Sequence, residues 1–307
     1  MKGIVIKSTG SWYTVMGESS EVYNCRIKGK FRMKDIKSTN PIAVGDNVEF
    51  ETGDNYTGTI TKIEPRKNYI IRKSINLSKQ SHILAANIDQ AFLVVTMVFP
   101  KTSTGFIDRF LVTAEAYKIP TIILFNKSDL LDNDLIEMQN ELKELYEKIG
   151  YPCFEISALN NEDLLMIKNQ MKDKVNLISG HSGVGKSTLI NALEPSLNLK
   201  TGVISQVHSK GMHTTTFAEM HPLSNGGFII DTPGIKELGL IDIKKEELAH
   251  FFPELRLHMD KCHFKNCHHI NEPKCAVKEA VENGAISESR YYNYLSMYHS
   301  EEMEEKY

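Results

Sequence analysis

The chain has 307 residues, of which 41% are hydrophobic and 24% charged, and its formal net charge at pH 7 is −3. These totals indicate two or three folded domains and exclude a disordered chain and a polycation. The longest apolar run, residues 91–99, has about half the length of a bilayer-spanning helix, and residues 1–7 lack the apolar core of a signal peptide. The five cysteines, an odd count, argue against a framework of disulfide bonds. Together these features predict a cytoplasmic protein without membrane association.

The first 68 residues form the most basic part of the chain, with 11 basic and 8 acidic side chains. Short apolar stretches alternate there with turn residues, which predicts a small β-barrel domain over residues 1–68. The expected strands are Gly3–Lys7, Ser11–Met16, Glu21–Lys34, Asn47–Glu51 and Thr57–Ile63.

Within this region, basic residues occupy every second position of one expected strand. They are Arg26, Lys28, Lys30, Arg32 and Lys34. In a strand they would share one face, and five neighbouring cations favour a phosphate backbone as partner over a plain solvated face. Three aromatic residues, Trp12, Tyr13 and Tyr23, could either stack on bases or fill the barrel core.

After a boundary at residues 64–68, apolar strands alternate with amphipathic helices. This order predicts a central α/β domain, residues 69–240, with a parallel sheet covered by helices on both faces. The expected strands are Gln90–Phe99, Thr121–Phe125, Pro152–Ile156, Val175–Ser179 and Gly227–Ile230, and the expected helices are Gly105–Lys118, Leu135–Ile149 and one starting at Thr188. Ligands of such sheets bind at the carboxyl ends of the strands, where the polar motifs of this chain occur.

Two of those motifs have the chemistry of guanine recognition. The segment 126–129 reads Asn-Lys-Ser-Asp and resembles the NKxD motif of GTP-binding proteins. The carboxylate of Asp129 can accept hydrogen bonds from both N1–H and the 2-amino group of guanine, a donor pair that adenine lacks. Asn126 and Lys127 would brace the loop and cover the base. The segment Ser157, Ala158 and Leu159 resembles the second guanine loop, in which a backbone N–H contacts the 6-oxo group.

The next strand is followed by a phosphate loop. Its residues are Gly180, His181, Ser182, Gly183, Val184, Gly185, Lys186 and Ser187, with Thr188 at the start of the helix that follows. Glycines at this spacing let backbone N–H groups surround phosphate oxygens at a helix N-terminus. Lys186 would contact the β- and γ-phosphates, and the hydroxyl of Ser187 would bind Mg²⁺.

Two later stretches predict the switch segments of a nucleotide-hydrolysing site. Residues 211–216 include three threonines, of which Thr215 or Thr216 would bind Mg²⁺. Residues 231–234 follow an apolar strand and resemble the DxxG motif. In that motif Asp231 would bind Mg²⁺ through water, and the N–H of Gly234 would contact the γ-phosphate.

Residues 241–307 form a third expected domain, mainly helical, with helices over 244–250 and 287–299 and an acidic end that suggests a solvated tail. Cys262, Cys267 and Cys275 lie within fourteen residues, beside His263, His268 and His269. Three thiolates and one imidazole make a closed tetrahedral set suited to a structural Zn²⁺ rather than a catalytic metal.

The order of the motifs is permuted, because both base-recognition loops precede the phosphate loop. A permuted GTPase domain between a β-barrel and a Cys/His cluster resembles the ribosome small-subunit-dependent GTPase A (RsgA) family over nearly the whole chain. The resemblance implies an OB-like, RNA-binding barrel and His269 as the fourth zinc ligand. It also implies a monomer that binds the small ribosomal subunit and its rRNA, and that hydrolyses GTP, with Mg²⁺, during late subunit assembly.

One position departs from ordinary GTPases. Ile235 stands where a water-orienting glutamine often follows DxxG, which predicts slow intrinsic hydrolysis that the ribosome stimulates. The family resemblance suggests His213 for positioning the water, although His213 could equally stabilise the switch loop. Three alternatives remain open: a GTPase acting on tRNA or another RNA–protein particle, a nucleic-acid-binding module with nucleotide as a conformational ligand, and a P-loop kinase or ATPase.

Overall fold

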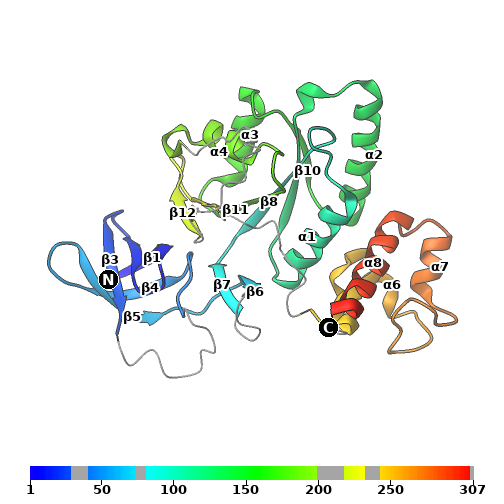
Figure 1. Cartoon of the computed structure of the whole chain (residues 1–307), viewed down its shortest axis with the longest axis horizontal. Helices are drawn as coiled ribbons and strands as arrows, with labels where there is room; N and C mark the ends of the chain where they lie inside the picture. The colour runs from blue at the N-terminus through cyan, green and yellow to red at the C-terminus, as the bar shows by residue number, and fades with distance from the viewer. Residues whose placement is uncertain (29–40, 74–80, 199–217, 232–242, 305–307) are drawn as a thin grey trace.

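The computed structural model describes residues 1–28, 41–73, 81–198, 218–231 and 243–304. Within these ranges the chain folds into an N-terminal β-barrel, a central α/β unit and a C-terminal helical unit (Figure 1). Among the described helices, none combines the length and apolar character needed to cross a membrane.

The barrel consists of five strands that close because β1 pairs with both β2 and β4. Its strands are β1 (Lys2–Ser8), β2 (Tyr13–Gly17), β3 (Val22–Ile27), β4 (Asn47–Thr52) and β5 (Thr57–Ile63). Tyr13 is buried in the barrel core and Tyr23 packs against it, whereas Trp12 is 42% exposed. Of the two roles considered for these aromatics, Tyr13 and Tyr23 therefore fill the core, and Trp12 remains available to a partner.

Strand β3 follows the first part of the predicted strand Glu21–Lys34, and its pairing with β5 extends to Ile27. Residues 29–34 of that prediction are not among the described residues. Up to that point the alternation is as expected: Cys25 is buried, whereas Arg26 and the following Lys28 are exposed. The remaining members of the basic stripe, Lys30, Arg32 and Lys34, lie outside the described residues.

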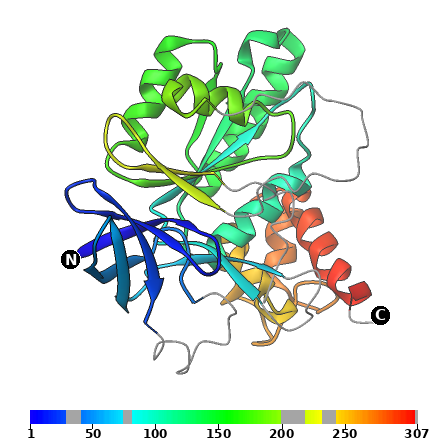
Figure 2. The ribbon, with the colours of Figure 1, turned by 60° about the vertical axis from the view of Figure 1, so that its left-hand side comes forward.

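The central sheet is parallel except at one edge, in the order β10-β9-β8-β11-β13-β12. Its strands are β8 (Gln90–Val95), β9 (Thr121–Asn126), β10 (Cys153–Ile156), β11 (Val175–Ser179), β12 (Glu219–Pro222) and β13 (Phe228–Asp231). The antiparallel β12, which sequence reasoning missed, pairs with β1 at Lys7 and Glu219, so the barrel and the central strands form one continuous sheet (Figure 2).

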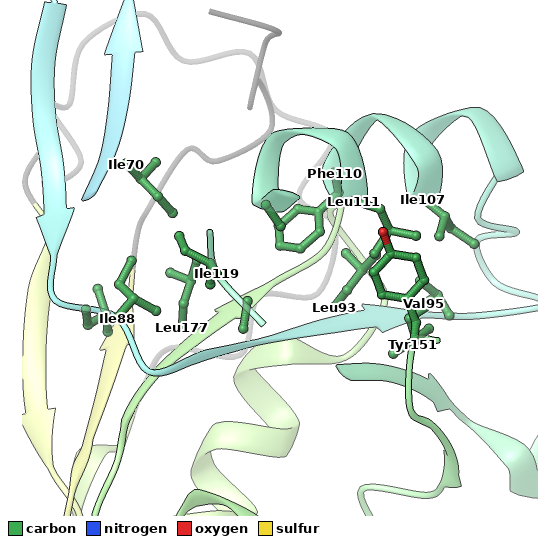
Figure 3. Packing of buried hydrophobic residues seen from close by; sticks show 14 of the residues in the cluster. Ile70, Ile88, Leu93, Val95, Ile107, Phe110, Leu111, Ile119, Tyr151 and Leu177 are labelled. Carbon is green, nitrogen blue, oxygen red and sulfur yellow. The ribbon is translucent and has the colours of Figure 1, made fainter. Parts of the chain in front are cut away.

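Helices cover both faces of the central sheet, as predicted. They are α1 (Thr104–Ala116), α2 (Asn133–Ile149), α3 (Asn161–Met171) and α4 (Lys186–Leu193). Along β8, Leu93 and Val95 pack into the cluster of α1 and α2, whereas Phe92 and Val94 pack into the cluster of α3 and α4. Figure 3 shows Phe110 of α1 beside the sheet. Every β8 side chain is buried, and the strand is continuously apolar from Ala91 to Val95, as is typical of a central parallel strand.

Strand β8 ends four residues before the predicted end at Phe99. The chain turns at Thr96, whose backbone N–H donates to Oγ1 of Thr102 (3.0 Å) while its carbonyl accepts from the N–H of Thr102 (2.8 Å). The apolar residues Met97–Phe99 therefore belong to a connection that leads into α1, and not to the strand.

A hairpin that sequence reasoning did not anticipate, β6 (Tyr69–Lys73) and β7 (Ser81–Ala86), lies between the barrel and the central unit. Ile70 and Ala85 of this hairpin share one apolar cluster with Val44 of the barrel region and with residues of β8. The hairpin thus continues the hydrophobic core from one unit into the next (Figure 3).

The C-terminal unit is helical, as expected. It contains α5 (Lys245–Leu248), α6 (Pro253–Met259), α7 (Ala276–Glu282) and α8 (Glu288–Glu304). Its apolar cluster includes Phe252, Leu255 and Tyr294, and Val112 from α1 joins it. Helix α1 therefore contacts both the central sheet and the C-terminal unit (Figure 1).

Candidate functional site

The phosphate-loop sequence lies between β11 and α4, the strand–loop–helix context that its function requires. Gly180, Gly183 and Gly185 all have positive φ, at 148°, 88° and 98°. A Cβ on Gly180 would lie 2.4 Å from the carbonyl oxygen of Val94, so no larger residue fits there. The Nζ of Lys186 donates to the carbonyls of Gly180 (2.5 Å) and His181 (2.7 Å), which holds the lysine against the loop.

The first base-recognition loop follows β9 and is joined to the phosphate loop by Asn126. The Nδ2 of Asn126 donates to the carbonyl of Val184 (2.8 Å), and its Oδ1 accepts from the N–H of Ala158 (3.2 Å). One buried side chain thus connects three loops that are far apart in sequence. Lys127 adds a second connection, because its Nζ donates to the carbonyl of Gly183 (2.8 Å) and also to that of Phe99.

The remaining base-recognition residues lie at the same edge of the sheet. Asp129 is exposed in a short 3-10 turn, Ser128–Leu130, directly after Lys127. In the second loop, the N–H of Ser157 donates to Asp163 (2.8 Å), and the N–H of Leu159 donates to Oγ of Ser157 (3.2 Å). The contacts of Asp129 and of this second loop with a guanine base remain predictions.

Sequence reasoning missed the connection between β8 and α1 as part of this site. Besides the carbonyl of Phe99, the connection contributes Pro100, whose ring lies 3.0 Å from the position of a Cβ on Gly183. It also contributes Thr102, whose Oγ1 lies 2.7 Å from Nε2 of His181. No motif marks these residues, since their role depends only on the adjacency of β8 and β11 in the sheet.

The switch predictions lie mostly outside the described residues. This applies to His213, Thr215, Thr216 and Gly234. Asp231 ends β13, which runs parallel to β11 with Ile230 opposite Leu177, so its backbone reaches the same sheet edge as the phosphate loop. The roles predicted for these residues toward Mg²⁺, water and the γ-phosphate remain predictions.

A second candidate site lies in the C-terminal unit. The ligand atoms of Cys262, Cys267, His269 and Cys275 lie within 4.8 Å of one another. A tetrahedral zinc ion with ordinary bond lengths needs S···S edges of about 3.8 Å and N···S edges of about 3.5 Å. The sulfurs of Cys262 and Cys275 are 3.9 Å apart, and Nδ1 of His269 lies 3.6 and 3.4 Å from them. These three ligand atoms have the spacing of a tetrahedral metal site, and Cys267 supplies the fourth candidate ligand of the group.

The segment that carries the four candidate metal ligands, residues 262–275 and here named the metal-binding loop, is held from two sides. Burial alone would raise the pKa of Glu272, but the backbone N–H groups of His268 and Ile270 donate to its carboxylate, and the pKa falls to about 2. On the other side, the hydroxyls of Tyr291 and Tyr294 in α8 donate to the carbonyls of His269 and His268, both at 2.6 Å. Helix α8 is thus bound directly to the loop that carries the metal ligands.

The competing histidines do not join the cluster. The ring of His263 packs edge-on against Phe264, and that of His268 lies 5.9 Å from the ring of Tyr298. The group of convergent ligand atoms in the described structure contains His269 alone among the three.

On the barrel, one exposed aromatic residue is paired with a cation. The guanidinium of Arg26 lies 3.8 Å from the ring centre of Trp12, a cation–π contact at the surface. A stacked guanidinium and indole offer flat surfaces and positive charge, which suit bases and phosphates.

Comparison with known proteins identifies the relatives of this chain. A family described as RsgA GTPase matches residues 63–241, and the RsgA N-terminal domain matches residues 2–60. A small ribosomal subunit biogenesis GTPase RsgA of Bacteroides fragilis (strain YCH46) is 57% identical over 302 residues, which are 98% of this chain and 97% of the relative. Its counterpart in Flavobacterium psychrophilum is 56% identical and covers 97% of this chain and 92% of its own length.

Two solved structures share the fold. YjeQ from Thermotoga maritima superimposes with a TM-score of 0.81 at 39% identity, covering 97% of both chains. YloQ, described as a circularly permuted GTPase, superimposes with a TM-score of 0.77 at 34% identity and covers 97% of this chain and 94% of its own.

Proposed function

The chain belongs to the RsgA family of circularly permuted GTPases, and on this premise we propose that it hydrolyses GTP while it assists late assembly of the small ribosomal subunit. The observation that carries the proposal is the match over nearly the full length, at 57% identity, to a small ribosomal subunit biogenesis GTPase. The contacts of Asn126 and Lys127 support it, because they join the base-recognition and phosphate loops into one site despite the permuted order.

In this site, Asp129 would select guanine, and the loop at Ser157–Leu159 would contact the 6-oxo group. The glycine-rich loop would hold the phosphates with its N–H groups. Lys186 would turn from the loop carbonyls to the β- and γ-phosphates and stabilise charge that develops during hydrolysis. The carbonyls that Lys186 contacts lie in the phosphate loop itself, so the lysine needs only a side-chain rotation.

Mg²⁺ fits the oxygen-rich set of Ser187, Asp231 and Thr215 or Thr216. Ser187 is the last residue of the phosphate-loop sequence and lies in the first turn of α4, directly after Lys186. When bound, Mg²⁺ would neutralise charge on the β- and γ-phosphates. The ion at the second site is proposed to be a structural Zn²⁺, because three thiolates and one imidazole form a soft, closed ligand set.

Slow intrinsic hydrolysis follows from Ile235, whose side chain can neither donate nor accept a hydrogen bond to water. We propose that the ribosomal subunit completes the site, with His213 as the residue that positions water.

We further propose three units, residues 1–68, 69–240 and 241–307, in a monomeric cytoplasmic protein. The barrel would contact rRNA through its basic stripe, of which Arg26 and Lys28 are exposed. Stacked Trp12 and Arg26 make this face suitable for single-stranded or distorted RNA.

The test is GTP turnover by the purified protein alone, with small subunits, with large subunits and with bare rRNA. Strong stimulation by small subunits alone is expected. Equal stimulation by bare rRNA would point to another RNA–protein particle, and an absence of any stimulation would contradict the proposed partner. ATP competing equally with GTP would contradict the role of Asp129.

A further inference from the structure

Helix α1 lies between the two candidate sites. Its first residues follow the connection that contacts the phosphate loop, and its outer face packs on the C-terminal unit that carries the metal ligands (Figures 1 and 2). Polar contacts join the start of α1 to the phosphate loop and its outer face to the C-terminal unit. Neither the family motifs nor the proposed catalytic roles account for these contacts.

At the phosphate loop, His181 is held by residues before and within α1. Its Nε2 lies 2.7 Å from Oγ1 of Thr102, its Nδ1 lies 3.1 Å from the carbonyl of Ser182, and its ring packs edge-on against Phe106 at 5.3 Å. Since a carbonyl can only accept, Nδ1 carries the proton, and Nε2 accepts from the hydroxyl of Thr102. That hydroxyl in turn accepts from the N–H of Thr96 at 3.0 Å, so donors and acceptors match along the whole chain of contacts.

On its outer face, α1 is fixed to α8 by buried polar groups. Asp108 is 0% exposed and Arg290 1% exposed, and Nη1 of Arg290 donates to Oδ1 of Asp108 at 2.6 Å. Arg290 also binds both carboxylate oxygens of Glu254 in α6, at 2.6 and 3.1 Å. Nδ2 of Asn293 donates to Oδ2 of Asp108 (2.6 Å) and to Oγ1 of Thr104 (3.3 Å), the first residue of α1.

The same helix α8 reaches the metal-binding loop. Arg290 and Asn293 lie three residues apart and face α1, whereas Tyr291 and Tyr294 donate to the carbonyls of His269 and His268. Such a buried network has well-defined geometry, because a displaced member leaves a charge or a polar group unsatisfied.

We propose that α1 and α8 form a rigid connection through which the phosphate loop and the metal-binding loop influence each other, with Thr102, His181, Asp108, Arg290 and Asn293 as its positioning residues. The route runs entirely through described residues and does not require segments 199–217 and 232–242, which contain the predicted switches. It rests on the proposed nucleotide site and adds a means of regulation. A nucleotide that orders the phosphate loop would stabilise the C-terminal unit. By linkage, stabilisation of the C-terminal unit would strengthen nucleotide binding by the same free energy.

The experiment measures GDP affinity of the full-length, metal-loaded protein by fluorescence of a labelled nucleotide. The variants are Asn293→Ala, Thr102→Val and the double variant. Asn293→Ala is expected to weaken GDP binding about fivefold, the lower range of measured couplings. In the Thr102→Val background the same change is expected to have no further effect. Thr113→Val is the matched control, since Thr113 is a buried threonine of α1 whose hydroxyl donates within the helix, to the carbonyl of Arg109 at 2.8 Å.

The loss of GDP affinity in the double variant is compared with the product of the losses in Asn293→Ala and Thr102→Val. Agreement within about twofold would overturn the proposal, because independent sites behave in that way. A second measurement needs no change at the α1–α8 interface. Hydrogen exchange is followed in residues 276–299 with and without GDP, and GDP is expected to increase protection there in the wild type but not in Thr102→Val. Equal protection in both proteins would assign the coupling to another route. Both readouts use GDP alone, so they can fail while stimulation by small subunits is normal.

Discussion

At the scale of single residues, the site depends on side chains that join loops rather than on side chains that only face a ligand. Asn126 uses its amide as donor to one loop and as acceptor from another, which neither aspartate nor alanine could do. By contrast, Asp129 is exposed beside it and would act on the base itself. The two residues therefore predict different consequences of substitution.

Asp129→Asn is expected to weaken GTP binding about 10–100-fold, because an amide cannot accept both donors of guanine. Xanthine carries an oxo group where guanine has its 2-amino group. The side-chain N–H of the introduced asparagine can donate to this oxo group, so the variant is expected to favour XTP over GTP relative to the wild type. Competition of GTP and XTP for the labelled nucleotide measures the change. Asn126→Ala serves as the comparison: it is expected to weaken both nucleotides without changing their ratio, and an unchanged ratio in Asp129→Asn would contradict base recognition by this carboxylate.

His181 is expected to bind its second proton at a lower pH than a free histidine does. Burial, followed by the charges of Lys186 and Lys127, lowers its pKa below the ordinary 6.5. The unfolded chain therefore binds a proton first as the pH falls, so this residue's contribution to stability is full above pH 6.5 and declines as the pH falls through its lowered pKa. Nuclear magnetic resonance titration of the histidine rings tests this. A ring of His181 that titrates at or above 6.5 would contradict the lowered pKa.

At the scale of elements, the parallel strands of the central sheet position their functional groups at their carboxyl ends. The turns after these strands are short and sterically restricted, as Gly180 shows with its φ of 148° beside the backbone of β8. Some other glycines with positive φ have no such contact. Gly150, at the C-terminus of α2, has a φ of 114° and nothing within 4 Å of an added Cβ.

These two glycines form a matched pair. Gly150→Ala is expected to cost about 1 kcal/mol of stability through backbone strain alone and to leave GDP affinity unchanged. Gly180→Ala adds a clash with the carbonyl of Val94, so it is expected to weaken GDP binding more than about tenfold by reshaping the loop. Thermal unfolding and GDP titration of both variants separate the two effects, and equal GDP affinities would refute the steric argument.

At the scale of the whole molecule, the units are joined by two kinds of contact. The barrel continues into the central sheet through β1 and β12 and through the hairpin β6–β7, whose core is apolar. The C-terminal unit is joined to α1 by the buried ionic network around Arg290. Burial alone would lower the pKa of Arg290, but Asp108 and Glu254 raise it, so the guanidinium stays charged.

Arg290→Met is expected to destabilise the protein by about 3–5 kcal/mol, because it leaves two buried carboxylates without their partner. Arg256 provides the control at the same interface: its side chain is 54% exposed and lies 3.7 Å from Glu115. Arg256→Met should cost less than about 1 kcal/mol. Denaturant unfolding measures both, and similar losses would mean that the network around Arg290 adds no more than a surface pair.

Removal of the metal is expected to loosen the C-terminal unit selectively. The purified protein should hold one zinc ion, and chelation or Cys262→Ser should increase hydrogen exchange in residues 253–299, because the ligand loop loses its central bonds. Cys153→Ser is a useful comparison, since Cys153 is buried in the central sheet far from the cluster in sequence. Full metal content in Cys262→Ser would contradict the ligand assignment.

Much of this protein could be predicted from its sequence, because local patterns carry the information. Alternating strands and helices, the loops at Asn126 and Gly180, and the spacing of three cysteines report on short stretches of chain. They were sufficient for the three-unit fold and for the family. The fourth metal ligand depended on the family resemblance, and the distances from Nδ1 of His269 to the sulfurs now support it.

The tertiary structure alone decided which distant residues meet. The polar contacts of Thr102 with His181 and of Asp108 with Arg290 span 79 and 182 residues. His181 lies in the phosphate-loop motif, but no motif marks Thr102, Asp108 or Arg290 as its partners. The continuity of the barrel with the central sheet likewise depends on β12, a four-residue strand too short for a clear periodicity. Such contacts arise from the packing of whole elements against one another, which periodicity within a single element does not encode.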